Sequence, residues 1–162
     1  MKKLEIEYKF LIKMPDENML SALEGVRILK LSQTYTTLGA RARRIEENGN
    51  VTYIKTVKKH ITDLVRLETE NEITKAEFDS LLEHREGNTV EKTRYVYPYK
   101  DKKIEIDVFP FWKNQAFLEV ELENENEEFE LPEFIEVIRD ITEDKAYRNY
   151  ALSKKIPKEE KF

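Results

Sequence analysis

Acidic and basic side chains alternate with apolar ones along the first segment of this chain. In LEIEYKF, residues 4–10, every second position is charged: Glu5, Glu7 and Lys9. In a β-strand such residues point to the same face. Taken alone, the segment predicts a half-buried strand whose charged face meets solvent. Carboxylates and ammonium groups are also the side chains that hold divalent cations and phosphate oxygens, so the remaining segments decide between the two roles.

The same alternation recurs in segment after segment, and the charges are sorted by sign. The basic members are Lys9, Arg41, Arg43, Lys55, Arg66, Lys92 and Arg94, and the acidic members are Glu5, Glu7, Glu68, Glu70, Asp107, Glu119 and Glu121. A sheet face in bulk water carries a mixture of charged and neutral polar residues, whereas these faces are almost entirely ionisable. We therefore expect them to line the interior of a closed barrel, with the apolar faces turned outward.

An interior that holds both signs of charge indicates a particular kind of ligand. Buried charges must be paired, hydrated or bound to a metal, because removing one from water costs several kcal/mol. A polyanion bound by Arg and Lys, and bridged to carboxylates by a divalent cation, meets that requirement. Phosphate chains with Mg²⁺ or Mn²⁺ fit, since these ions prefer oxygen ligands. There is no Walker-type glycine loop, so phosphate recognition would rest on side chains.

The elements that must position these charges are mostly strands joined by turns. Strands are expected at residues 4–13, 26–37, 40–47, 51–59, 63–73, 89–99, 102–111 and 115–123, and helices at 15–25, at 74–86 and within 142–155. Asn48 and Gly49 form a hairpin turn, and Thr74 with Glu77 has the spacing of a capping box. This order predicts an α+β fold, mainly antiparallel β: an eight-stranded closed tunnel with helices packed on the outside.

Composition limits the class of protein. The 162 residues predict a single domain, 1–162, and 38% of them are charged, against about 25% in an average globular protein. The chain has no cysteine and two separated histidines, His60 and His84, which argues against disulfides and a zinc site. No apolar run reaches the length of a membrane span, so a cytoplasmic protein is expected. The net charge of −5 argues against a nonspecific nucleic-acid surface. A homodimer is kept as an alternative to a monomer.

The ordered set of charges resembles a known family, the CYTH domains of the triphosphate tunnel metalloenzymes, and in particular its short bacterial inorganic triphosphatases. The matching elements, over residues 3–152, are Glu5-x-Glu7-x-Lys9, Arg41-x-Arg43, Lys55, Arg66-x-Glu68-x-Glu70, Lys92-x-Arg94, Asp107, Glu119-x-Glu121 and the closing segment at residues 140–152. One such element alone is a weak signal. The whole set in the family's order is specific.

The resemblance implies an eight-stranded tunnel that cleaves triphosphates with Mg²⁺ or Mn²⁺. The implied metal ligands are Glu5, Glu7, Asp107, Glu119 and Glu121; the implied substrate-binding residues are Lys9, Arg41, Arg43, Lys55, Arg66, Lys92 and Arg94; and the implied catalytic residues are Lys9, Glu68 and Glu70. Either a carboxylate such as Glu68 or Glu70 or a second metal ion would activate the attacking water. Four further charges, Arg44, Lys58, Lys59 and Glu72, fit the pattern less well and are interpreted as surface charge.

Inorganic tripolyphosphate, cleaved to pyrophosphate and phosphate, is the expected substrate. No extra segment is available to recognise a nucleoside or thiamine. The same scaffold also hosts thiamine triphosphatases, nucleoside and RNA triphosphatases and class IV adenylate cyclases, which remain alternatives. A noncatalytic polyphosphate-binding module is a further alternative, although binding an anion alone does not call for so many carboxylates.

Overall fold

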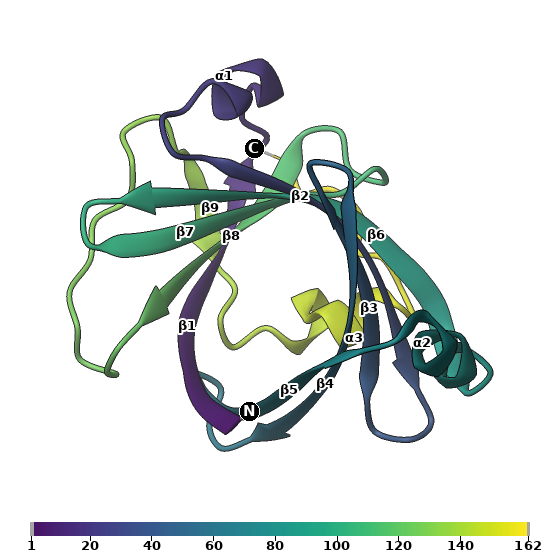
Figure 1. The fold of residues 1–162 in the computed structure, drawn as a ribbon. Helices are drawn as coiled ribbons and strands as arrows, with labels where there is room; N and C mark the ends of the chain where they lie inside the picture. The colour runs from purple at the N-terminus through teal and green to yellow at the C-terminus, as the bar shows by residue number, and fades with distance from the viewer. Residues whose placement is uncertain (1, 162) are drawn as a thin grey trace.

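The computed structural model describes residues 2–161, with side chains from residue 4 onward (Figure 1). Met1 and Phe162, the ends of the predicted domain, lie outside the described residues. The strands are β1 (Lys2–Lys13), β2 (Arg27–Thr36), β3 (Arg41–Glu47), β4 (Asn50–His60), β5 (Val65–Ile73), β6 (Arg85–Tyr99), β7 (Lys102–Val108), β8 (Gln115–Leu122) and β9 (Val137–Asp140). The helices are α1 (Glu17–Ser21), α2 (Lys75–Leu82), the 3₁₀ helix η1 (Lys145–Tyr147) and α3 (Asn149–Leu152).

Eight of the strands close into an antiparallel barrel, as predicted. They follow the order β5-β4-β3-β2-β6-β7-β8-β1, and a pairing between β1 and β5 completes the ring. The first half of β1, up to Ile6, pairs with β5, and its second half pairs along the same edge with β9, which was not predicted. Each strand of the ring therefore has a hydrogen-bonded neighbour on both sides, which closes the barrel.

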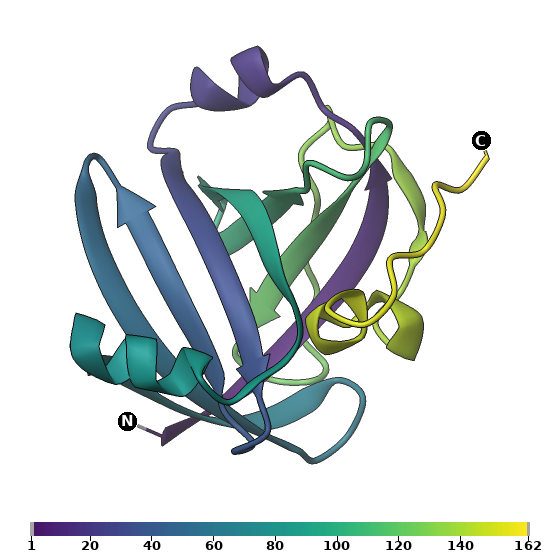
Figure 2. The same ribbon diagram turned by 90° about the vertical axis from the view of Figure 1, so that its right-hand side faces the viewer.

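Two of the helices lie outside the barrel wall (Figures 1 and 2). The predicted capping box of α2 is present: Thr74 Oγ1 accepts a 3.1 Å hydrogen bond from the Glu77 backbone N–H. Both helices are shorter than predicted. α1 ends at Ser21, and α2 ends at Leu82 because β6 already begins at Arg85. No helix in residues 2–161 is long and apolar enough to span a membrane.

The main apolar core lies on the outer face of the wall, as expected from the alternation. Buried outward-facing residues on β1, β7 and β8 pack beneath Leu20 of α1 and against the loop that carries Phe129. Phe129 reaches over Tyr8 of β1, with ring centroids 5.4 Å apart. Burial of these outward faces frees the opposite, inward faces of the same strands to carry charge.

A second apolar cluster lies inside the barrel, which the sequence did not predict. On three strands, and directly after the end of β7, the inward position next to the charged residues is apolar: Leu11, Val90, Phe117 and Phe109. These side chains pack with Trp112, Ile141, Tyr147 and Leu152. The cluster fills the barrel beside β1, β6, β7 and β8 and forms the seat for the segment that contains η1 and α3. We call this stretch, residues 141–155, the C-terminal segment.

Candidate functional site

The inward faces of the strands enclose two adjoining chambers. The outer chamber, of about 450 Å³, opens beside the β2–β3 turn and the β4–β5 turn. The inner chamber, of about 200 Å³, is lined by charged residues and Asn149. The two chambers adjoin, because both are lined by Glu7, Arg41, Lys58, Glu119 and Asn149.

Eleven of the predicted site residues line these chambers, and three do not. Those that do are Glu5, Glu7, Lys9, Arg41, Arg43, Arg66, Glu68, Glu70, Arg94, Glu119 and Glu121. Asp107 and Lys92 form a buried ion pair with each other beside the chambers, and Lys55 lies outside the barrel. Strand register explains the grouping: β1 and β8 pair Glu7 with Glu121 and Lys9 with Glu119, which places these four side chains on one interior face.

Two neighbouring arginines on β3 are buried without a negative partner. Arg41 and Arg43 are 7% and 8% exposed, and among the described residues neither forms an ion pair. Arg43 donates to Gln33 Oε1 at 2.9 Å and Arg41 to Thr56 Oγ1 at 3.4 Å, while the Nε of each has no hydrogen-bond partner in residues 2–161. Burial, reinforced by repulsion from Arg41 and Arg94, lowers the pKa of Arg43 to about 9. Such a pair is a ready site for an anion with several oxygens.

Glu7 lies near two other carboxylates, Glu119 and Glu5, which gives this part of the site an excess of negative charge. Burial raises the pKa of Glu7 well above its usual range, and the charges of Glu119 and Glu5 raise it further. Two cations lie near Glu119: Lys9 Nζ is 3.8 Å from its Oε1, and Arg94 Nη2 is 3.9 Å from its Oε2. Among the described residues, no three carboxylate or imidazole groups are grouped to hold a metal by themselves. Glu7 and Glu119 nevertheless fit Mg²⁺ or Mn²⁺, because such ions are usually held by one or two carboxylates together with substrate phosphates and water.

Glu5 and Glu68 form a third arrangement, a carboxyl pair that shares a proton. Burial together with the adjacent Glu5 raises the pKa of Glu68 to about 7. Burial acts on Glu5 in the same direction, but hydrogen bonding from Glu68 and the charge of Lys58 lower its pKa to about 2. Lys58 Nζ lies 2.8 Å from Glu5 Oε1 and 3.6 Å from Glu68 Oε2. A carboxyl group that titrates near neutral pH is suited to accept a proton from water.

Asp107, expected to be a metal ligand, is instead paired with two cations. Arg94 donates to both its oxygens, at 2.7 and 2.9 Å, and Lys92 Nζ lies 2.6 Å from Oδ2. Asp107 is 1% exposed, and these partners lower its pKa despite burial, which opposes the shift. Lys92 also donates to Asn149 Oδ1 at 3.2 Å. Asp107 and Lys92 therefore support Arg94 and the C-terminal segment from behind the chamber.

The C-terminal segment covers part of the barrel opening and is held at several points. Lys9 Nζ donates a 2.7 Å hydrogen bond to the Tyr147 carbonyl, and the Lys9 backbone N–H donates to Thr142 Oγ1. Gly87 has φ +77°, and a Cβ there would lie 2.8 Å from the Ser153 carbonyl oxygen. Glycine at this position therefore allows the segment's backbone to lie directly against β6, where Asn88 N–H bonds the same oxygen at 2.8 Å.

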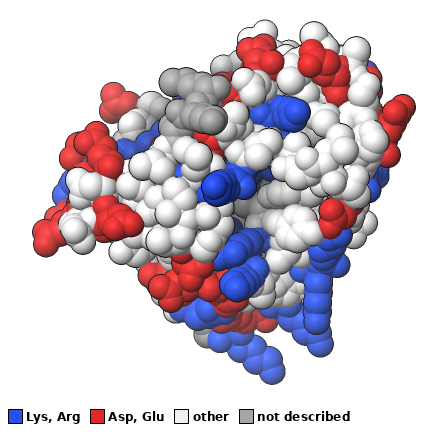
Figure 3. Space-filling model, turned by 90° about the horizontal axis from the view of Figure 1, so that it is seen from below, with Lys and Arg blue, Asp and Glu red and all other residues white. Residues whose placement is uncertain are grey.

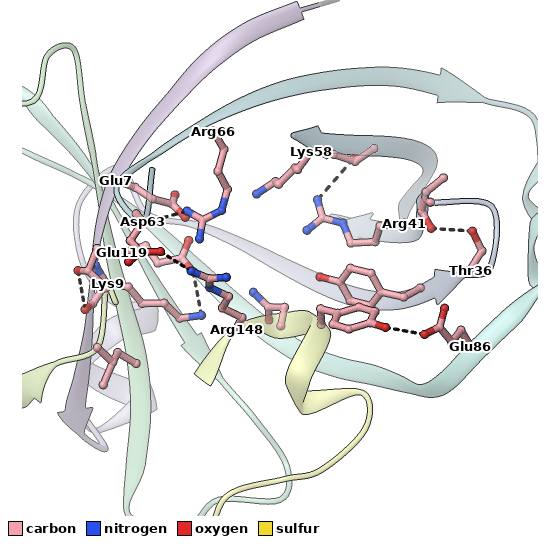
Figure 4. Close-up of a pocket in the computed structure, with 18 of the residues that line it drawn as sticks. Glu7, Lys9, Thr36, Arg41, Lys58, Asp63, Arg66, Glu86, Glu119 and Arg148 are labelled. Carbon is pink, nitrogen blue, oxygen red and sulfur yellow. Dashed lines mark hydrogen bonds and ion pairs between the residues drawn. The ribbon is translucent and has the colours of Figure 1, made fainter. Parts of the chain in front are cut away.

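Basic side chains from several elements converge on the outer chamber (Figure 4). Arg41, Lys58 and Arg66 point into it from the strands, and Arg148 points into it from the C-terminal segment. Seen from the side of the β4–β5 turn, Lys and Arg side chains gather around a hollow in the surface (Figure 3). Five basic and four acidic side chains line the outer chamber, whereas five basic and seven acidic side chains line the inner chamber, so the balance of charge changes from slightly basic to acidic between the two.

The order and placement of these residues match a known family. The profile of the CYTH domain matches residues 3–150. This chain belongs to the CYTH domain family.

Relatives of this CYTH chain carry the name inorganic triphosphatase. One from Nitrosomonas europaea is 33% identical over 157 residues, covering 94% of this chain and 99% of that protein. Another, from Acetivibrio thermocellus, is 36% identical over 117 residues, covering 70% of each. A solved structure of an inorganic triphosphatase aligns with a TM-score of 0.57 at 30% identity, covering 95% of this chain and 97% of that one.

Within the CYTH barrel, the lysine of β4 that faces the chamber is Lys58, and the prediction of Lys55 is wrong. Lys55 shares an outer groove with α2, where Tyr53 packs against Phe78 with ring centroids 4.8 Å apart and the ring planes tilted by 45°. The inward residues of β4 are Thr56 and Lys58. Tyr53 lies on the same strand face as Lys55, so its contact with Phe78 of α2 places both side chains outside the barrel.

The residues of the C-terminal segment were the other omission. Arg148, Asn149 and Tyr150 line the outer chamber. Arg148 is the residue between η1 and α3, and the other two belong to α3, a helix of one turn. Neither element has a strand's alternation, so periodicity did not indicate which of their side chains would face the barrel interior.

Proposed function

We propose that this protein hydrolyses inorganic tripolyphosphate to pyrophosphate and phosphate, with Mg²⁺ or Mn²⁺ as cofactor. The observation that carries the proposal is the opposed imbalance of charge within one cavity. Arg41 and Arg43 are buried and form no ion pair with any of the described residues, while Glu7 and Glu119 repel each other across the same space. A triphosphate bound with a divalent cation supplies the missing partner to both sets. The triphosphatase names of the relatives support the same substrate class.

In the proposed complex, the phosphate chain lies along the chambers. Arg41, Arg43 and Arg66 bind its oxygens, and Lys58 bridges the substrate to the carboxyl pair formed by Glu5 and Glu68. Glu7 and Glu119 hold the cation, with Glu5 and Glu121 in reach of the same inner chamber. The bound cation neutralises phosphate charge and orients the reacting groups. Asp107, Lys92 and Arg94 form the buried support of this arrangement.

Hydrolysis then requires a water molecule in line with the anhydride bond. The water oxygen forms a bond to the terminal phosphorus, and the bond from that phosphorus to the bridging oxygen breaks. Glu68, with a pKa of about 7, accepts the proton of the water, and Glu70 lies beside it in the inner chamber. Lys9 donates hydrogen bonds to the pyrophosphate as its negative charge increases. Phosphoryl transfer depends mainly on such alignment and charge neutralisation.

Phosphate release from purified protein tests the proposal. Tripolyphosphate, ATP and thiamine triphosphate would each be supplied with Mg²⁺, Mn²⁺ or EDTA, and ³¹P NMR would identify the products. We expect metal-dependent formation of equal amounts of pyrophosphate and phosphate from tripolyphosphate. The Lys9→Gln variant, purified in parallel, controls for a contaminating phosphatase, because its kcat is expected to fall by about 100-fold. No release from any substrate would leave only a binding function, and faster cleavage of ATP or thiamine triphosphate would replace the proposed substrate.

A further inference from the structure

The carboxylate of Asp63 lies at the mouth of the outer chamber, in contact with Arg148 and His60. Arg148 Nη2 donates to Asp63 Oδ1 at 2.8 Å, and His60 Nε2 lies 3.2 Å from the same oxygen. Arg66 Nη1 donates to the Asp63 backbone carbonyl at 3.4 Å. The β4–β5 turn thus places one anionic group between side chains from β4, from β5 and from the C-terminal segment.

Arg148 has donors to spare in this position. Asp63 engages its Nη2, while its Nε is buried and has no hydrogen-bond partner within residues 2–161. A guanidinium offers five N–H donors in a planar fork that matches two oxygens of a phosphate. Figure 4 shows Arg148 directed into the cavity, close to Arg66 and on the same side as Lys9 and Glu119.

We propose that Arg148 is a substrate-binding residue and that Asp63 is its partner only while the chamber lacks a phosphate. This inference rests on the proposed function and adds a specific residue to it. The Arg148 and Asp63 side chains are 29% and 39% exposed, and a pair so exposed is worth little in water. A phosphate group carries more negative charge than a carboxylate and binds both edges of the guanidinium, so it displaces Asp63.

The arrangement has an alternative reading, in which the Arg148–Asp63 pair simply fastens the C-terminal segment to the β4–β5 turn. The two readings predict opposite signs for Asp63. If Asp63 competes with substrate for Arg148, removal of its charge increases the fraction of protein in which Arg148 is free, and binding tightens. If the pair is a fastening, loss of either partner loosens the mouth and weakens binding.

Four variants separate these readings: Asp63→Asn, Arg148→Gln, the double variant and Arg148→Lys. Asparagine keeps an oxygen acceptor for His60 while removing the charge. The dissociation constant of tripolyphosphate would be measured by calorimetry in EDTA, and KM and kcat would be measured with Mg²⁺. The matched control is Arg27→Gln, which breaks an exposed arginine–carboxylate pair between β2 and β3, with Arg27 Nη2 2.8 Å from Glu47 Oε1.

We expect Arg148→Gln to raise the Kd and KM by about tenfold, and Arg148→Lys to recover part of that loss. Asp63→Asn should lower both by about two- to fivefold, and should have no effect when Arg148 is already glutamine. Weaker binding in Asp63→Asn, or an unchanged Kd in folded Arg148→Gln, would overturn the inference while leaving the proposed function intact. Wild-type protein that neither binds nor cleaves tripolyphosphate would overturn both.

Discussion

The ammonium group of Lys9 on β1 donates a 2.7 Å hydrogen bond to the backbone carbonyl of Tyr147 in η1. Its Nζ also lies 4.1 Å from the centroid of the Phe117 ring. Burial lowers the pKa of Lys9, and the charge of Glu119 opposes that shift. β1 and the C-terminal segment therefore hold Lys9 between them, at the boundary between the charged chambers and the apolar cluster inside the barrel.

Lys9→Gln should lower kcat by about 100-fold, because it removes a hydrogen-bond donor aimed at the leaving pyrophosphate. Steady-state phosphate release from tripolyphosphate measures the effect. Lys9→Arg keeps the charge but cannot reproduce a single ammonium held by the Tyr147 carbonyl, so little recovery is expected. A kcat within threefold of wild type in Lys9→Gln would place Lys9 outside the reaction.

Arg43→Met should stabilise the free protein and weaken its binding of substrate. A buried guanidinium between Arg41 and Arg94 destabilises the free state, and replacing it with an apolar side chain of similar length removes that repulsion. Loss of charged hydrogen bonds to phosphate should cost about 1.5–3 kcal/mol of binding. Thermal unfolding in EDTA and titration with tripolyphosphate test the two effects. A lower Tm together with an unchanged Kd would contradict both.

A matched pair of lysine variants tests the assignment on β4. Lys58→Met should raise KM by about tenfold, because Lys58 is the β4 lysine that faces both chambers and a charged hydrogen bond is worth about 1.5–3 kcal/mol. Lys55→Met makes the same change three residues earlier, in the groove beside α2. Its KM should stay at the wild-type value. The reverse order of effects would restore the interpretation drawn from the sequence.

Glu7→Gln should reduce affinity for the metal by at least about tenfold, since one of two carboxylates that face the proposed cation loses its charge. The same change removes repulsion with Glu119 and should leave the free protein as stable as wild type or more stable. Mn²⁺ binding followed by electron paramagnetic resonance, in the absence of substrate and in its presence, measures this directly. Glu46→Gln, on the outer face of β3, serves as the control and should bind Mn²⁺ like wild type.

The Glu5–Glu68 pair predicts a dependence of stability on pH. The pKa of Glu68 rises from its ordinary 4.5 to about 7 on folding, so the folded state retains a proton that the unfolded chain releases within this window. Stability should therefore fall as pH rises from about 4.5 to 7. Glu68→Gln remains neutral and should lose less stability across the window. Melting curves in EDTA at several pH values provide the test, and parallel profiles for the two proteins would exclude the shared proton.

Side-chain direction within the barrel was predictable from the sequence where alternation was strict. Glu5, Glu7 and Lys9, or Glu119 and Glu121, occupy alternate positions between apolar residues, and a strand allows only one way of burying such a pattern. Lys55 was misplaced because β4 has less contrast between its two faces. The outward position of Tyr53, which settles the phase, depends on contact with α2.

The sequence by itself determined the antiparallel barrel, its charged interior and most of the residues that line it, because a period of two and the burial of apolar faces are local properties. Only the tertiary structure decided how those charges divide. It left Arg41 and Arg43 without ion-pair partners among the described residues, bound Asp107 to Arg94 and Lys92, and brought Arg148 beside Asp63. These relationships depend on contacts between residues far apart in the chain, and no spacing along the sequence encodes them.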